Sequence, residues 1–184
     1  LRDYPMFVGN GDYHLQAFSP LIDAGDPDIL DVDGSPSDIG FYGGPAGESY
    51  GYVDLPPGIP EDLSAEVDFD EGIIYLNWQF NHEADFNRYP VYRDTVSGFE
   101  PSIFNIIAEP ESSYYADADW TPDHDYYYRI SSVDDQDNMS DYSEELEVIL
   151  TSIWGEPGVE RPKITAITSS YPNPFNSQTT IVYH

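Results

Sequence analysis

The chain of 184 residues contains no cysteine, and it has only 6 lysine and arginine residues against 35 aspartate and glutamate residues. The absence of cysteine excludes disulfides, thiolate nucleophiles and cysteine-ligated zinc. The formal net charge of −29 at pH 7 excludes a nucleic-acid binder, because so acidic a surface repels phosphates instead of releasing their counterions. Long hydrophobic runs are missing too: no stretch of about 18 apolar residues is present, so we expect no membrane insertion.

The composition nevertheless favours a folded, β-rich protein. Apolar residues make up 40% of the chain and aromatic residues 15%, which is enough core-forming side chain for folding despite the charge. The 16 tyrosines, 16 prolines and 14 glycines favour strands and turns over helices. We therefore predict an all-β fold.

Two proline-rich stretches, Leu55–Pro60 and Gly155–Pro162, divide the chain, because prolines restrict their own backbone and that of the preceding residue. They predict a turn-dense capping segment over residues 1–55, a β-sandwich over 56–152, a linker over 153–162 and an incomplete C-terminal β domain over 163–184. The first segment has few apolar residues, so we expect it to cap a larger body. Because the chain ends within a strand-like run, we expect it to be part of a longer polypeptide.

Within residues 56–152, short strand patterns alternate with turn residues, as is typical of a β-sandwich. In Ile73–Trp78, residues Ile74, Leu76 and Trp78 share one face, which predicts a half-buried strand with Trp78 inside. Proline cannot donate to a strand ladder, so Pro90 marks an edge or a bulge. Further predicted elements are strands at Arg88–Arg93, Tyr126–Val133 and near Glu145–Leu150, a hairpin turn at Asp134–Asn138, and strands at Lys163–Thr168 and Thr179–Tyr183.

Two of the segments resemble known families. The run Phe7–Gln16, followed by residues 19–27 and 38–45, resembles the C-terminal end of secreted bacterial right-handed parallel β-helix proteins. That resemblance implies that the coils of a parallel β-helix lie upstream of Leu1. Residues 59–151 resemble a fibronectin type III domain, through Pro60, Trp78, Tyr92-Arg93 and Tyr126-x-Tyr128-Arg129-Ile130. Tyr126 stands where that family has its tyrosine corner, whose hydroxyl bonds back to the chain.

A third resemblance lies at the C-terminus. Ile164–Ile167, then Tyr171–Asn176 and Thr179–Tyr183, is similar to the start of the C-terminal sorting domain of the type IX secretion system. This implies secretion machinery as a partner. The three resemblances together imply a protein that is extracellular or on the outer surface of a Gram-negative bacterium.

Clustered aspartates predict a calcium site, because Ca²⁺ takes 6–8 oxygen ligands in flexible geometry. The alternative is a solvated loop in which aspartates satisfy nearby backbone N–H groups. The predicted ligands are Asp26, Asp28, Asp31, Asp33 and Asp38. A second, weaker cation candidate is the group Asp134, Asp135, Asp137 and Asp141, for which a hairpin turn is the preferred interpretation.

Three further residues are candidate contacts with glycans. Trp120 and Trp154 are candidate carbohydrate contacts, since exposed aromatic rings stack on sugar faces, although strands favour aromatic residues for packing as well. Asp94-Thr95-Val96 resembles the O-glycosylation acceptor of bacteria that use this secretion route, which makes Thr95 a candidate glycosylation site. Polysaccharide or a cell-surface glycan is therefore a candidate partner.

No catalytic constellation stands out, since nucleophile elbows, phosphate-binding loops and zinc-type histidine spacings are absent from the sequence. We predict a non-catalytic structural or adhesive segment of a large secreted or cell-surface bacterial protein, which serves as spacer and export or attachment region. Two alternatives stay open. One is an accessory tail of an extracellular polysaccharide-degrading or polysaccharide-binding protein. The other is a self-associating subunit of an extracellular filament, which pairs through an open strand edge.

Overall fold

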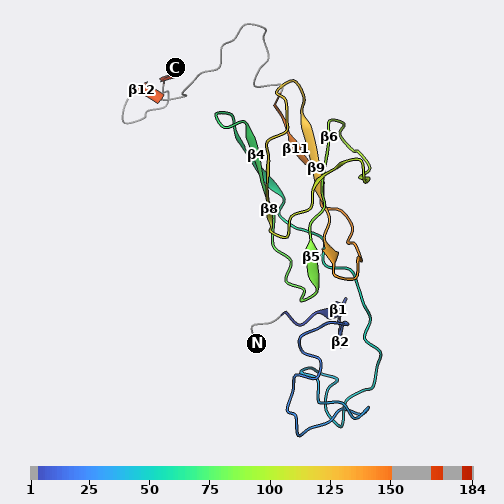
Figure 1. The fold of residues 1–184 in the computed structure, drawn as a ribbon. Coiled ribbons are helices and arrows are strands. Elements are labelled where there is room, and N and C mark those ends of the chain that lie inside the picture. Colours follow the sequence, from blue (N-terminus) through green and yellow to red (C-terminus); the bar gives the residue numbers. More distant parts are fainter. Residues whose placement is uncertain (1–3, 151–166, 172–179, 184) are drawn as a thin grey trace.

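A computed structural model describes residues 4–150, 167–171 and 180–183, and all regular structure in these ranges is β (Figure 1). Helices that could cross a bilayer do not occur there. The all-β prediction is confirmed. The strands are β1 (Phe7–Gly9), β2 (Asp12–Leu15), β3 (Ser64–Asp68), β4 (Ile73–Asn77), β5 (Phe86–Arg88), β6 (Val91–Asp94), β7 (Ile106–Ala108), β8 (Tyr114–Asp117), β9 (Tyr126–Ile130), β10 (Val133–Asp134), β11 (Leu146–Val148), β12 (Ile167–Tyr171) and β13 (Thr180–Tyr183).

The central part of the chain is a sandwich of two antiparallel sheets. One sheet has the order β3-β4-β8 and the other the order β11-β9-β6-β7. This arrangement is a fibronectin type III-like sandwich, as the sequence predicts. The buried hydrophobic core between the sheets consists of Ile74, Leu76, Trp78, Tyr89, Val91, Tyr126, Tyr128, Ile130, Val148 and Leu150.

Strand β4 shows how sequence alternation builds this core. Ile74, Leu76 and Trp78 are buried, while the residues between them are only partly buried or exposed, as expected for a strand with one covered face. The predicted strand Arg88–Arg93 is interrupted at Pro90, which separates β5 from β6. The missing N–H of proline accounts for this break in the ladder.

Strand β9 begins where predicted, but the single strand predicted over Tyr126–Val133 is divided: β9 ends at Ile130, and Val133 begins β10, which pairs with β5 in another sheet. Between them the Ser132 N–H donates to the Ser140 hydroxyl at 3.0 Å and not to a neighbouring strand.

The Thr121 N–H donates to the Tyr126 hydroxyl at 3.0 Å, so the predicted tyrosine corner is present. After β10, the Asp134 N–H donates to the Asn138 carbonyl at 3.2 Å, and Asp137 has a φ of 65°. This closes the expected hairpin turn.

A buried charged bridge joins the two sheets. Arg93 on β6 donates to both carboxylate oxygens of Asp117 on β8, at 2.9 and 2.7 Å. The Tyr128 hydroxyl on β9 donates to the same carboxylate at 2.8 Å. Asp117 is only 1% exposed, so these donors replace the water that its charge needs.

The N-terminal segment contains one antiparallel hairpin, β1–β2, and a parallel bridge between Gln16 and Val53. It lies at the end of the sandwich near β5 (Figure 1). The contact is direct: Met6 is buried, and its sulfur accepts a hydrogen bond from the Ala84 N–H at 3.3 Å. Residues 4–53 therefore cap one end of the sandwich.

The C-terminal strands β12 and β13 pair in antiparallel register, with Tyr171 opposite Thr180. The predicted strand at Thr179–Tyr183 matches β13. The strand predicted at Lys163–Thr168 overlaps β12 at Ile167 and Thr168, and its residues 163–166 lie outside the described part of the chain, as does the predicted linker 153–162.

Candidate functional site

The two least exposed members of the predicted calcium loop, the buried Asp38 and the partly buried Asp31, bond to the loop itself. The carboxylate of Asp38 accepts hydrogen bonds from the Asp23 N–H at 2.9 Å and from the Tyr52 hydroxyl at 3.0 Å. The carboxylate of Asp31 accepts from the Asp38 N–H at 3.0 Å and also from the Gly44 N–H. These two side chains therefore hold residues 23–52 together.

The other predicted ligands, Asp26, Asp28 and Asp33, are exposed. The carboxylate of Asp26 accepts from the Asp28 N–H at 3.0 Å. That of Asp33 accepts from the Ser35 N–H at 3.0 Å and from the Ser35 hydroxyl at 2.7 Å. The two Ser35 bonds lower the pKa of Asp33, since they favour the ionised form. Calcium binding by this loop stays a prediction.

The glycan candidates occupy different surroundings. Trp120 is partly buried against the core, and its ring centroid lies 6.2 Å from that of Phe69. Thr95 is exposed, directly after β6. Trp154 lies outside the described residues. The roles of these three residues stay predictions.

Three other aspartates converge where the cap meets the sandwich, and we call them the junction carboxylates: Asp54, Asp85 and Asp134. Each offers an oxygen, and the three oxygens lie within 4.8 Å of one another. Across residues 4–150 and the two C-terminal strands, no other set of three acidic, histidine or cysteine side chains meets so closely. Asp54 comes from the linker, Asp85 precedes β5 and Asp134 ends β10, and pairing of β10 with β5 brings the last two together.

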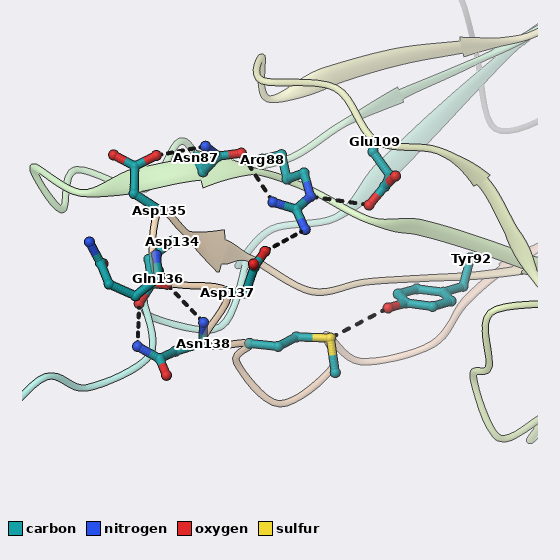
Figure 2. Close-up of polar contacts among 10 residues, drawn as sticks. Asn87, Arg88, Tyr92, Glu109, Asp134, Asp135, Gln136, Asp137 and Asn138 are labelled. Carbon is teal, nitrogen blue, oxygen red and sulfur yellow. Dashed lines mark hydrogen bonds and ion pairs between the residues drawn. The ribbon is translucent and has the colours of Figure 1, made fainter.

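Two of the junction carboxylates share a donor. The Asn138 side-chain amide donates to Asp134 and to Asp54, at 2.9 Å in each case. Asp134 also accepts from the backbone N–H groups of Gln136 at 2.9 Å and Asn138 at 2.8 Å. Figure 2 shows Asn138 folded back toward Asp134 within this turn. The linker is thus tied to the β10 turn through one amide group.

Asp85 is different, because one of its oxygens is buried without a partner. The residue is 5% exposed, and among the described residues no group donates to its Oδ2. Burial raises the pKa of Asp85, and the negative charges of Asp134 and Asp54 raise it further. An unpaired buried carboxylate is costly unless a cation or a proton neutralises it.

The cationic side chain of strand β5, Arg88, pairs with acidic residues other than the junction carboxylates. Arg88 on β5 pairs with Glu109 at 3.2 Å and with Asp137 at 3.0 Å (Figure 2). Asn87 donates to Asp135 at 2.6 Å on the other side of the strand. The acidic turn after β10 therefore uses its exposed aspartates to fasten β5, while Asp134 points to the junction.

Sequence reasoning found only part of this site. It included Asp134 in the weaker cation candidate and passed over Asp54 and Asp85. No local spacing connects these three residues, since they come from a linker, a loop and a strand. The only sequence signal for this site is that one aspartate directly precedes β5 and another ends β10. This signal becomes meaningful only when the pairing of β5 with β10 is known.

Comparisons with known proteins give structural similarity only. No family model matches the chain, and no curated protein matches it. An Fn3-like protein from Clostridium thermocellum is 29% identical, with 50% of this chain and 90% of that chain covered and a TM-score of 0.43. Pectate lyase PelI from Erwinia chrysanthemi is 21% identical, with 49% of this chain and 28% of that chain covered and a TM-score of 0.40.

The spore cortex lytic enzyme SleM from Clostridium perfringens is 22% identical, with 63% of this chain and 34% of that chain covered and a TM-score of 0.42. The chain thus spans about a third or less of the length of the two enzymes. All three TM-scores lie below 0.5, so the assignment of the fold rests on the strand order and burial described above.

Proposed function

We propose that this chain is a non-catalytic structural spacer in a secreted or surface-attached bacterial protein. The observation that carries the proposal is the way the chain passes through the sandwich. It enters beside the N-terminal cap and, after β11, leaves at the opposite end (Figure 1). A domain connected in this way adds its full length between the parts that flank it.

A spacer needs a stiff connection, and the entry to the sandwich is held by several bonds. The Gly58 carbonyl accepts from the Asn81 side chain at 2.8 Å and from the Ser132 hydroxyl at 2.7 Å. The Gly58 N–H donates to the Glu83 carboxylate at 2.8 Å. Together with the Met6 contact, these bonds fix the linker on the sandwich and support a rigid junction.

The spacer role is tested by the spread of distances between the cap and the far loop of the sandwich. The chain has no cysteine, so no other thiol reacts with a spin label. Two labels are attached at the exposed positions Val32 and Val96 through the substitutions Val32→Cys and Val96→Cys. Pulsed electron paramagnetic resonance is expected to give one narrow distance distribution. A matched control with a flexible Gly-Ser insertion after Gly58 is expected to broaden it. A distribution as broad in the parent chain as in the control would contradict the proposal.

Export belongs to the same proposal and has a separate test. The similarity of residues 163–184 to a sorting domain supports delivery of the parent protein to the outer surface. In cells that produce the parent protein, an antibody against the folded sandwich is expected to label intact cells. Labelling that appears only after cell lysis would contradict it.

A further inference from the structure

We propose that the junction carboxylates Asp54, Asp85 and Asp134 form a calcium site that fastens the linker to the sandwich. The proposal goes beyond the spacer role, which needs a stiff junction but no particular ion. It also differs from the predicted loop site at residues 26–38, with which it shares no residue. Two independent observations carry it.

The first observation is the geometry of the oxygens. Three carboxylate oxygens within 4.8 Å of one another fit around one ion, because opposite ligands at a Ca²⁺–oxygen distance of about 2.4 Å are about 4.8 Å apart. Mg²⁺ binds at about 2.1 Å in strict octahedral geometry. Three protein carboxylates around one ion therefore favour Ca²⁺ over Mg²⁺, which keeps most of its water.

The second observation is the unpartnered oxygen of Asp85. It is fully buried, and its residue lies beside two further carboxylates. Desolvation, combined with repulsion from like charges, makes an anion at this position unfavourable. A bound divalent cation removes both costs and leaves no buried oxygen without a partner.

The surroundings complete the coordination. Asp54 is exposed, so water reaches one side of the site. The Asn138 amide already bridges Asp54 and Asp134, and rotation of this amide by half a turn presents its oxygen to the ion in place of its nitrogen. With three carboxylates, one amide oxygen and water, the site reaches the 6–8 ligands that Ca²⁺ takes.

The test is a calorimetric titration of CaCl₂ into the chelator-stripped full chain, combined with amide chemical shifts measured by NMR. We expect saturable binding and Ca²⁺-dependent shifts at Asp54, Asp134 and Asn138. Asp85→Asn keeps the shape of the side chain and is expected to abolish binding at the junction. Asp54→Asn, at an exposed position, is expected to weaken that binding at least tenfold.

Asp33→Asn is the matched control, since it removes one charge from the other acidic cluster and is expected to leave the shifts at the junction unchanged. Three results would overturn the proposal: no binding, shifts confined to residues 23–40, or junction binding that Asp54→Asn leaves at full strength. In the second case calcium binds in the loop, and in the third it binds at the junction without Asp54. In the first, a proton on Asp85 neutralises the site. None of these results bears on the spacer role, which the distance measurement tests separately.

Discussion

Removal of the Asp117 side chain is expected to destabilise the sandwich strongly. In Asp117→Ala, the Arg93 guanidinium, with only 16% of its side chain exposed, loses both carboxylate bonds, and the Tyr128 hydroxyl loses its acceptor. Removal of one partner of a buried ion pair lowers the free energy of unfolding by about 3–5 kcal/mol, because the remaining charge is left uncompensated. In a domain of about 100 residues each kcal/mol lowers the Tm by about 4–8 °C, so we expect a fall of at least about 12 °C.

The free energy of unfolding is measured by urea denaturation, followed by the fluorescence of the buried Trp78. Asp119→Ala is the matched control: its side chain is exposed, and only its backbone carbonyl accepts from Arg93. Exposed substitutions of this kind change stability by about 0.5 kcal/mol or less. If Asp117→Ala lowers the free energy of unfolding by less than about 1 kcal/mol, or by no more than the control does, the bridge between Arg93 and Asp117 does not stabilise the sandwich as expected.

Three further predictions follow from the described contacts. Tyr126→Phe removes the acceptor of the Thr121 N–H and is expected to lower the unfolding free energy by about 1 kcal/mol in urea denaturation. Burial raises the pKa of Tyr128 above its usual 10.0, so the stability that its neutral form contributes is present below pH 10 and lost as the pH rises further. Urea midpoints measured between about pH 8 and pH 11 should fall more steeply in the parent chain than in Tyr128→Phe. Met6→Ala empties a buried position and removes the contact to Ala84, so chymotrypsin should cleave faster at the aromatic residues of the cap, such as Tyr13, Phe18 and Phe41, while β4 and β9 stay protected. Equal cleavage rates in both proteins would count against docking of the cap.

Strands β4, β6, β9 and β11 were predictable because their signals are local, whereas β3, β7 and β8 were not predicted. Alternation in β4 placed Ile74, Leu76 and Trp78 on one face, and each is buried in the structure. The break at Pro90 follows from the chemistry of a single residue. The tyrosine corner likewise needs only Tyr126 and a donor five residues earlier in the chain.

The candidate sites were less predictable, because they depend on contacts between distant parts of the chain. Composition indicated a cation near Asp31 and Asp38, yet whether their oxygens face an ion or the backbone depends on loop conformation. Asp54 carried no signal of its own, and the position of Asp85 before β5 becomes informative only once the strand pairing is known. Both residues meet Asp134 only because β5 pairs with β10 and the linker folds onto that turn.

The spacer role requires that the cap and the sandwich move as one rigid body through the linker at residues 54–58. Residual dipolar couplings of backbone amides, measured in a weakly aligned sample with CaCl₂, test this requirement most directly. A single alignment tensor is expected to fit the couplings of residues 4–53 and 59–150 together. Two tensors of clearly different magnitude would show independent motion of the two parts and would contradict the spacer role.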